Sequence, residues 1–378
     1  MKNYLKILLV IETGGAGSGR HVVDLARALS SQGHRVSVVY SPRRADSWFV
    51  NEIAALDNVR VYIQPMQRGP HFSDFAAIAR VRRIISDDGP FDIVHGHSSK
   101  GGAISRLAAC RTGSKSLYTP HAFITMNHTM SAAKRFFYGS IERLLAPFAD
   151  AVICVSSAEY DHALSLKISR RVLRTVPNGL RPLAEENRAD IRAELGLNAD
   201  DVAIGFVGRL DPQKAVDMLI LAFAETAKQH ANARLVIVGQ GADEPALRQL
   251  ADSTGAADRI VWTGPASGAR LMAAFDLLAM PSLYEAFPYV LIEAAFRGLP
   301  IVATAVGGTA ELVHDDYNGK IVAQRDPAGL AVELGRLVSD EQKRQRYGAA
   351  SKELGKNFTV EVMAANTLAL YRELQDAA

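Results

Sequence analysis

The residues best suited to chemistry lie between Pro281 and Glu293, in a run that reads PSLYEAFPYVLIE. The apolar segment 277–281 before it predicts a buried strand, and Pro288 fits the first position of a helix. Glu285 is therefore expected in a loop, and Glu293 about two turns inside the helix. A loop carboxylate and the free amides of a helix start can bind sugar hydroxyls, and a carboxylate further along can bind a ribose diol. Two solvated glutamates are the alternative.

A pair of cations follows a second predicted strand, 202–207. Arg209 comes directly after Gly208, and Lys214 follows five residues later, past the turn Asp211-Pro212. Two positive side chains beside a helix start can neutralise the charge of a diphosphate as it leaves. Two surface cations in a loop would give the same pattern.

The first predicted strand is followed by the glycine-rich stretch GGAGSGR, which contains Gly14, Gly15 and Gly17. Glycines between a strand and a helix let backbone amides approach an anion closely. Arg20 stands where a dinucleotide fingerprint needs its last glycine, and Arg20 and His21 replace the lysine and hydroxyl of a phosphate-binding loop. A dehydrogenase and an ATPase are both disfavoured, and a purely structural turn remains the alternative.

These motifs lie along an alternation of strand-like and helix-like segments that predicts parallel sheets. The expected strands are 5–11, 35–40, 93–95, 116–119 and 151–155 in the first half, and 202–207, 235–238, 260–262, 277–281 and 301–303 in the second. The expected helices include 20–30, 216–230, 288–297 and a final one at about 360–375. The fold class is therefore α/β, with two Rossmann-like domains that face an interdomain cleft.

A chain of 378 residues exceeds the usual size of one hydrophobic core. We expect an N-terminal domain at 1–180 and a C-terminal domain at 181–359, with a hinge near Pro177-Asn178-Gly179. The C-terminal helix, about 360–378, either completes the second domain or packs back on the first. The sequence leaves this open.

The net charge of +3 is distributed unevenly. Residues 1–180 contain 23 Lys and Arg against 13 Asp and Glu, whereas residues 181–378 contain 20 against 27. A basic half suits an anionic membrane surface, phosphate groups or nucleic acid, unless the imbalance is accidental.

The chain has features of a protein from a reducing compartment. Cys110 and Cys154 have no spacing typical of a metal site or a disulfide framework. The basic start Lys2–Lys6 is followed by only about five apolar residues before Gly14, which is too short for a signal peptide. No stretch approaches the ~20 apolar residues of a membrane span. We expect a cytoplasmic protein, with any membrane contact peripheral and on the inner face of the cytoplasmic membrane.

Taken in order, the motifs resemble those of the large retaining GT-B glycosyltransferase family, glycosyl transferases group 1, which includes bacterial polysaccharide and phosphatidylinositol mannosyltransferases. The resemblance covers nearly the whole chain. The motifs that carry it are the glycine-rich loop, Thr119-Pro120-His121, VPNG at 176–179, FVGRL at 206–210 with Lys214, IVGQG at 237–241, Thr263-Gly264, the run 281–293, and VATAVGG at 302–308 with Glu311.

For the donor side, the resemblance implies a role for each matching residue. Arg209 and Lys214 would hold the diphosphate of a nucleotide-sugar donor. Glu285 would contact the transferred sugar, with Ala286-Phe287-Pro288 beside it, and Glu293 would bind the nucleotide ribose.

For the N-terminal domain, the resemblance implies that His121 lies near the sugar, across the cleft from the donor. Gly14, Gly15 and Gly17 would lie near phosphate or acceptor. A histidine at a strand end is also common as hydrogen-bonded scaffolding, so His121 alone is weak evidence. His95 and His97, at the end of another strand, are candidates for the acceptor site.

Two positions depart from the family pattern. Ala215 and Ala286 stand where glycine often follows the lysine and the first glutamate. Each adds only a methyl group, so we expect activity to be kept, and the departures bear on donor-sugar preference.

The family resemblance also implies transfer without a metal. The sequence contains no Asp-x-Asp pair of the kind that holds a cation on a donor diphosphate. We therefore expect no metal and no cofactor, with Arg209, Lys214 and helix dipoles meeting the leaving-group charge.

The resulting hypothesis is a retaining glycosyltransferase that moves a sugar from a nucleotide-sugar donor to a polysaccharide or lipid-linked glycan acceptor in bacterial-type surface polysaccharide biosynthesis. No nucleic-acid partner is expected. A non-catalytic sugar-nucleotide or glycan-binding module on the same fold is the alternative. An NAD-dependent oxidoreductase would require a fingerprint that this chain lacks.

The stretch Met126–Phe148 combines Lys134, Arg135 and Arg143 with several aromatic and aliphatic residues. A basic amphipathic helix can lie on an anionic membrane. It can also be a core helix with a snorkelling edge. The basic N-terminal half favours membrane contact, which would suit a lipid-linked acceptor.

Overall fold

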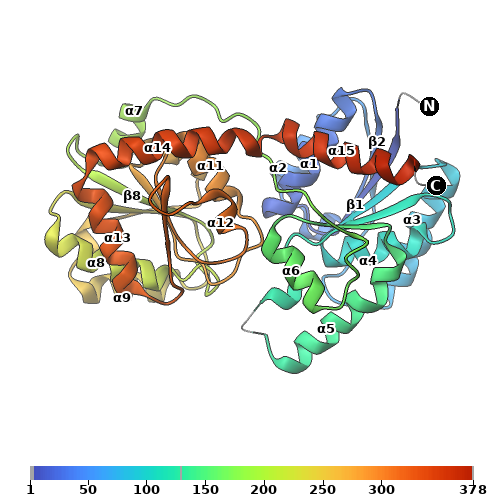
Figure 1. Cartoon of the computed structure of the whole chain (residues 1–378), viewed down its shortest axis with the longest axis horizontal. Coiled ribbons are helices and arrows are strands. Elements are labelled where there is room, and N and C mark those ends of the chain that lie inside the picture. The colour runs from blue at the N-terminus through green and yellow to red at the C-terminus, as the bar shows by residue number, and fades with distance from the viewer. Residues whose placement is uncertain (1–3, 128–129, 377–378) are drawn as a thin grey trace. The chain divides into compact units, whose positions relative to one another are not determined.

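The computed structural model describes residues 4–127 and 130–376, and the chain forms two compact units (Figure 1). Unit 1 comprises residues 1–181 and 359–378, and unit 2 comprises residues 182–358. Three features discussed from the sequence extend beyond the described residues. They are Lys2 of the basic start, His128 and Thr129 of the stretch 126–148, and the last two residues of the segment 360–378.

Unit 1 contains a seven-stranded parallel sheet in its described part, with the order β3-β2-β1-β4-β5-β6-β7. Its strands are β1 (Lys6–Ile11), β2 (Arg35–Tyr40), β3 (Val59–Ile63), β4 (Ile93–His97), β5 (Lys115–Thr119), β6 (Ala151–Cys154) and β7 (Leu173–Thr175).

The continuous apolar run of β1 is explained by helices on both faces of this sheet. Ile7, Leu9 and Ile11 pack into one core together with residues of α1, α2 and α15. Leu8 and Val10 point to the opposite face and pack with residues of α3 and α4. Because successive side chains of a strand alternate between faces, a strand covered on both sides has to be apolar throughout.

The helices of unit 1 connect these strands, except for α15, which follows unit 2 in the chain. They are α1 (Ala16–Ser31), η1 (Pro42–Arg44), α2 (Ser47–Ala54), α3 (Ser73–Asp87), α4 (Ser98–Ala109), η2 (Ile124–Met126), α5 (Ala132–Leu145), η3 (Ala146–Phe148), α6 (Ser157–Ser165) and α15 (Val360–Asp376).

The last helix, α15, belongs to unit 1. Figure 1 shows it beside α1, and the two helices are in contact although they lie at opposite ends of the sequence. Met363, Leu368 and Tyr371 are buried in the core that also contains Ile7 and Leu9 of β1. The chain therefore returns to unit 1 after unit 2 is complete.

Unit 2 contains a six-stranded parallel sheet in its described residues, with the order β10-β9-β8-β11-β12-β13. Its strands are β8 (Val202–Val207), β9 (Ala233–Val238), β10 (Ile260–Gly264), β11 (Leu277–Met280), β12 (Ile301–Thr304) and β13 (Gly319–Val322). Its helices are α7 (Arg188–Glu194), α8 (Val216–Gln229), α9 (Glu244–Thr254), η4 (Ala257–Arg259), α10 (Gly268–Leu271), η5 (Met272–Ala274), α11 (Tyr289–Arg297), α12 (Thr309–Leu312), α13 (Pro327–Ser339), α14 (Glu341–Gly355) and η6 (Lys356–Phe358).

The structure corrects the expected start of the first helix. The sequence places it at Arg20, whereas α1 begins at Ala16 with Gly15 as its N-cap. Gly17 therefore lies in the first turn of the helix and not in a loop. The turn tolerates Gly17 and Gly19 because Gly19 packs against Gly14, where a Cβ on Gly19 would lie 2.8 Å from the Gly14 carbonyl. Within the described ranges, no helix combines the length and apolar character needed to cross a bilayer.

Candidate active site

The candidate residues of unit 2 follow the two strands at which the strand order reverses. β8 and β11 are neighbours, and the chain then proceeds from them to opposite edges of the sheet. Ligands of open parallel sheets bind outside the carboxyl ends of the strands at such a point. Arg209 and Lys214 follow β8, and Glu285 follows β11. The topology therefore brings together two loops that are about 70 residues apart in sequence.

Lys214 and Glu285 form an ion pair between these loops, with 2.5 Å between Lys214 Nζ and Glu285 Oε1. Their side chains are only 14% and 10% exposed. The Gln213 side-chain amide donates to the Tyr284 carbonyl at 2.9 Å, and the Leu283 N–H donates to the Gln213 carbonyl at 2.8 Å. Two residues singled out separately in the sequence thus meet, and the backbone around them is fixed.

Arg209 has a different environment from Lys214. Its side chain is 67% exposed and pairs with Asp211, with 3.0 Å between Arg209 Nη2 and Asp211 Oδ2. The same nitrogen donates to Gln213 Oε1 at 3.0 Å. The guanidinium is held at the mouth of the loop, where an arriving anion can compete with Asp211 for it.

The segment after Glu285 leads into α11. Pro288 is the N-cap residue, with an extended backbone (φ −75°, ψ 130°), and the helix begins at Tyr289. The expectation that Pro288 is the first helical residue is therefore wrong by one position. Ala286 and Phe287 are buried, and the Phe287 ring packs on Phe358 at a centroid distance of 5.2 Å. The start of α11 also carries the positive end of the helix dipole, which suits it to a polar or anionic ligand.

Glu293 lies inside α11, as expected, and is 8% exposed. It is thus a buried carboxylate on the helix that the Glu285 loop leads into. The reading of Glu285 and Glu293 as two solvated glutamates is wrong, because both residues are buried.

Gly307 and Gly308 support the backbone of the Glu285 loop. No role in the site was predicted for them. The Gly308 N–H donates to the Ala286 carbonyl at 2.7 Å. Gly307 has φ +48°, and a Cβ there would lie 2.0 Å from the Glu285 carbonyl oxygen. Only glycine fits this close approach. The signal in the sequence was the Gly-Gly that follows strand β12.

Ala215 immediately follows Lys214 and has a left-handed backbone, with φ 47° and ψ 47°, as the N-cap of α8. This conformation is unfavourable for residues with a Cβ. It explains why glycine is common there in the family pattern. The relevant property of Ala215 is therefore its backbone conformation, and not the volume of its methyl group.

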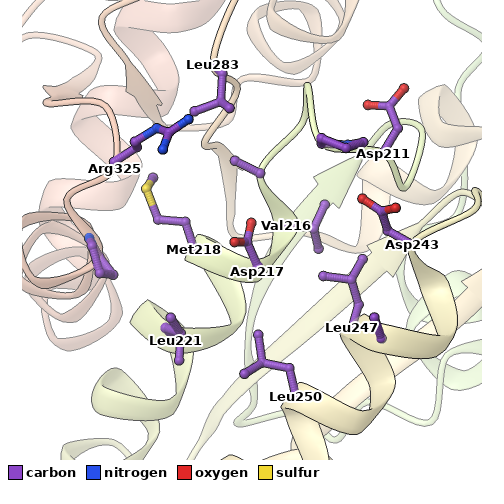
Figure 2. A pocket seen from close by; sticks show the side chains of 14 residues that line it. Asp211, Val216, Asp217, Met218, Leu221, Asp243, Leu247, Leu250, Leu283 and Arg325 are labelled. Atoms are coloured by element: carbon purple, nitrogen blue, oxygen red, sulfur yellow. The ribbon is translucent and has the colours of Figure 1, made fainter. Parts of the chain in front are cut away.

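A pocket of about 590 Å³ adjoins these loops on unit 2, over the start of α8 (Figure 2). Leucines of α8 and α9 line it, with Asp211 and Asp243 at one end and Arg325 at the other. Asp217 adds a third carboxylate. Three acidic groups are poorly suited to a diphosphate, so this pocket is a poor candidate for the donor site.

In unit 1, the glycine loop is packed too tightly for larger residues. The Gly14 N–H donates to the Arg44 carbonyl at 3.0 Å, and a Cβ on Gly14 would lie 2.6 Å from the Phe49 ring. A Cβ on Gly15 would lie 2.8 Å from Asp46 Oδ2. Gly14 and Gly15 therefore have structural reasons for being glycine, whatever they bind.

His121 lies in a cluster with His21 and His97. His121 Nε2 is 3.1 Å from His97 Nδ1, and the rings of His21 and His121 meet edge to face at 4.6 Å. His21 Nδ1 is 3.1 Å from Asn178 Oδ1. Burial lowers the pKa of His21 to about 4 and the pKa values of His97 and His121 well below 6.5, so these rings are neutral at pH 7.

His95 has a structural role in this cluster. Its Nδ1 lies 2.7 Å from the Tyr371 hydroxyl of α15, and its Nε2 lies 2.8 Å from the Thr119 hydroxyl. Both ring nitrogens are thus engaged inside the core. The histidine that sequence reasoning missed is His21, which it used only as a mismatch to a phosphate-binding loop. No local spacing connects His21 with the other two.

Glu159 fixes the backbone next to His121. Its carboxylate accepts hydrogen bonds from the N–H groups of Ala122 and Val155, both at 2.7 Å. His121 and Ala122 have φ values of 54° and 79°, so this loop needs external support. Burial raises the pKa of Glu159 to about 7. No sequence motif indicates Glu159, because its partners are backbone N–H groups, which any residue provides.

Comparisons with known proteins agree with this arrangement. Residues 16–179 match the glycosyl transferase 4-like domain, and residues 187–354 match the glycosyl transferases group 1 domain. A D-inositol 3-phosphate glycosyltransferase from Mycobacteroides abscessus is 30% identical, over 95% of this chain and 85% of that protein.

Solved structures show the same fold. HepE from Anabaena, in complex with UDP and glucose, has a TM-score of 0.84 and 22% identity, with 98% of this chain and 100% of that one covered. WaaG, a glycosyltransferase involved in lipopolysaccharide biosynthesis, has a TM-score of 0.75 and 19% identity, with 97% and 99% covered. The fold is GT-B, with two Rossmann-like domains, and the chain belongs to the glycosyl transferases group 1 family.

Proposed function

We propose that this glycosyltransferase moves a sugar from a nucleotide-sugar donor to a polysaccharide or lipid-linked glycan acceptor, with retention of configuration and without a metal, in bacterial-type surface polysaccharide biosynthesis. The observation that carries the proposal is the Lys214–Glu285 pair, with Arg209 beside it, where the strand order of unit 2 reverses. Cations and a carboxylate at that position suit a donor that has both a diphosphate and a sugar.

Each donor-site residue has a proposed task. Lys214 and Arg209 neutralise the charge that develops on the departing diphosphate. Glu285 accepts hydrogen bonds from the transferred sugar, beside the helix-start amides near Ala286, Phe287 and Pro288. Glu293 accepts from the ribose diol. In the chain without donor, carboxylates already balance both cations, so donor binding exchanges Asp211 and Glu285 for phosphate oxygens.

In unit 1 we assign His121 to the sugar, and Gly14, Gly15 and Gly17 to phosphate or acceptor. A neutral imidazole can both donate and accept a hydrogen bond to a hydroxyl. The lowered pKa of His121 keeps the ring in that state at pH 7.

Metal independence is supported by the composition of the site. The sequence contains no Asp-x-Asp pair. Arg209 and Lys214 supply the positive charge that we assign to the diphosphate. We propose a nucleotide sugar as the only small molecule required besides the acceptor, with no cofactor.

The first experiment is a thermal-shift screen of UDP-, GDP- and ADP-sugars, followed by transfer assays with the sugar that stabilises best. A ligand at 100 times its dissociation constant stabilises by ~2.7 kcal/mol, which is easily measured. We expect transfer to continue unchanged in excess EDTA, and NMR of the product to show the anomeric configuration of the donor. Activity that is lost in EDTA and restored by Mg²⁺ or Mn²⁺ would refute metal independence. Stabilisation without donor hydrolysis or transfer would favour the non-catalytic module instead.

The acceptor screen should include D-inositol 3-phosphate besides lipid-linked glycans. The relative from Mycobacteroides abscessus is named for that acceptor. Residues 1–180 carry 23 basic against 13 acidic side chains, a surplus that suits an acceptor with a phosphate group.

We also propose that α5 binds the inner face of the cytoplasmic membrane. Of the residues of α5, only Glu142 is buried, so the alternative of a core helix is disfavoured. Phe136, Phe137 and Leu144 are 79%, 52% and 71% exposed. Lys134 and Arg143 are exposed on the same helix. Exposed aromatic side chains next to cations are typical of a helix that lies in a membrane interface.

Vesicle sedimentation tests this proposal. We expect capture by anionic vesicles at low salt, weaker capture by neutral vesicles, and release as salt rises. The triple variant K134Q/R135Q/R143Q should bind more weakly, whereas K228Q/R248Q/K356Q, which removes exposed cations of unit 2, should bind normally. Equal capture by neutral and anionic vesicles, or no effect of the first triple variant, would refute it.

A further inference from the structure

We propose that His21, His97 and His121 bind a divalent transition-metal ion such as Zn²⁺, and that this ion inhibits the enzyme. The site lies wholly within unit 1, and the ion takes no part in the transfer reaction. The inhibitory effect rests on the role proposed above for His121, whereas the binding itself does not.

The ligand geometry is close to what zinc requires. One ring nitrogen from each histidine lies within 4.8 Å of the other two. His97 Nδ1 and His121 Nε2 are 3.1 Å apart. Two nitrogens bound tetrahedrally at 2.0–2.1 Å from zinc are separated by about 3.3 Å, so this pair needs only a small adjustment.

The three histidines come from different elements, which fix them independently. His21 lies on α1, His97 ends β4, and His121 follows β5. The sheet register pairs His97 with Thr119, two residues before His121, so the neighbouring strand ends hold these two histidines near each other. A site built on packed elements loses little entropy when an ion binds.

Hydrogen bonds orient the rings for binding. The Asn178 Oδ1 atom can only accept, so His21 Nδ1 carries the proton and the lone pair of Nε2 is available. A polar group that holds the second nitrogen in this way is the usual support of a metal-binding histidine. Asn178 is itself 5% exposed, so the support is internal.

His97 has an unsatisfied nitrogen. The side chain is fully buried, and within the described part of the chain its Nε2 has no hydrogen-bond partner. A buried polar atom without a partner costs about 1–3 kcal/mol. In the proposed site His97 binds the ion through Nδ1, so Nε2 carries the ring proton and is not itself a ligand atom.

The chemistry of the trio selects the kind of ion. All three rings are neutral at pH 7 because burial lowers their pKa values, and a metal binds only the neutral form. Three imidazoles without a carboxylate suit zinc and its neighbours, and do not suit Mg²⁺ or Ca²⁺, which prefer oxygen ligands. His95 is not a ligand, because both of its nitrogens are engaged.

Metal binding has a consequence for the reaction. An ion bound to His121 Nε2 occupies the lone pair of that nitrogen, which can then no longer accept a hydrogen bond from the donor sugar. Zinc should therefore inhibit transfer, and EDTA should restore it. This behaviour is the reverse of a metal-dependent transferase, so a single titration distinguishes an inhibitory ion from a catalytic one.

The test is calorimetric titration of tag-free protein with ZnCl2, without donor or acceptor. We expect one ion per chain, with a dissociation constant on the order of 1 µM or below. H97Q should lose this binding, and N178A should weaken it by about 10–100-fold. H71Q, which changes an exposed histidine of the same unit, and C110S, which removes a partly exposed thiol, should bind as the parent does. Co²⁺ should produce visible absorption in the parent and not in H97Q.

Circular dichroism and thermal melts establish that each variant is folded. If H97Q does not fold, H21Q replaces it, since His21 contributes its ligand from a helix. No zinc binding by the parent at about 100 times the expected dissociation constant would overturn the proposal, as would undiminished binding in both H97Q and H21Q. Inhibition by zinc that persists in H21Q would also overturn it. A failure of the donor assignment would appear separately, as a chain that binds zinc but whose transfer is unaffected by it.

Discussion

The two groups of polar residues, one in each unit, are held in opposite ways. In unit 2, Arg209 and Lys214 form ion pairs with carboxylates, and the Arg209 side chain is largely exposed whereas the Lys214 side chain is largely buried. In unit 1, His21, His97 and His121 are neutral and contact one another in the interior. The first group is ready to exchange its carboxylates for a ligand's anionic groups. The second is ready to share lone pairs with a hydroxyl or a metal ion.

This difference shows which chemistry each unit can supply. Charge neutralisation requires cations that are already fixed where the charge of a departing anion develops. Neutral hydrogen-bonding groups require burial, which keeps histidine unprotonated. In each unit, the local environment therefore sets the charge state of the polar side chains before any ligand binds.

The largest expected effect is on turnover. Lys214→Ala and Arg209→Ala should each reduce it by roughly 10²-fold or more, because each removes a charge aimed at the departing diphosphate. Steady-state transfer assays measure this. Lys228→Ala, which breaks an exposed ion pair of the same unit, is the control and should be unaffected. Parental rates in both site variants would disprove the donor assignment.

The same two variants should differ in stability. Lys214→Ala leaves the mostly buried Glu285 carboxylate without its partner, so its melting temperature should fall. Arg209 is two-thirds exposed, so its replacement should change the melting temperature little. Equal melting temperatures would mean that the Lys214–Glu285 pair is not formed in solution.

The next effect is a loss of stability in acid, which should be larger for unit 1 than for unit 2. The pKa of His21 is about 4 when folded and about 6.5 when unfolded, so the unfolded chain binds more protons between these values. Its contribution to the free energy of unfolding is present above pH 6.5 and falls by roughly 3 kcal/mol towards pH 4. His95, His97 and His121 act in the same direction. Glu159, with its raised pKa of about 7, and Asp24, whose pKa burial also raises, oppose the four histidines.

The two tryptophans allow this to be measured for each unit. Trp48 lies in unit 1 and Trp262 in unit 2. Urea unfolding of W262F and W48F, followed by fluorescence at pH 7.5 and pH 5.5, then reports on one unit at a time. Between pH 7.5 and pH 5.5, the urea midpoint should decrease in both variants. The decrease should be larger when Trp48 is the reporter than when Trp262 is. Equal shifts would show that the histidine cluster does not control the acid response.

The smallest expected effect is at Ala215. Because its backbone is left-handed, Ala215→Gly should stabilise unit 2 by about 0.5–1 kcal/mol. Ala286→Gly is the matched control. Ala286 is buried and its φ is not positive, so glycine there should destabilise by a similar amount. Thermal melts of both variants test this prediction. The melting temperature should rise for Ala215→Gly and fall for Ala286→Gly, and changes of the same sign would contradict it.

The sequence predicted most of the fold because the central strands are strongly apolar. β2 and β8 have the expected bounds, and other expected strands differ by one or two residues at an end. The strands β3, β7 and β13 were not predicted. β3 is an edge strand without a buried residue, β13 is an edge strand of four residues, and β7 has three residues, so none shows a long apolar run.

The candidate site was predictable where it consists of local motifs. Glu285, Glu293 and Lys214 each follow a strand within a recognisable run, so their loops could be placed by topology alone. The partners of these residues could not. That Lys214 pairs with Glu285, and that His21 joins His97 and His121, depends on side-chain packing between segments far apart in sequence. The role of Gly307, which belongs to the motif at 302–308, could not be predicted for the same reason, since it supports Glu285 through backbone contact.

The return of α15 to unit 1 affects the order in which the chain can fold during synthesis. All strands and helices of unit 2 precede residue 359, so unit 2 can fold while the last residues are still in the ribosome. Unit 1, although synthesised first, has one sheet face that α1 and α2 cover only in part until Met363, Leu368 and Tyr371 arrive. The N-terminal half of this protein is therefore the last to mature. A nascent chain stalled before residue 360 would present apolar surface to chaperones from its oldest part.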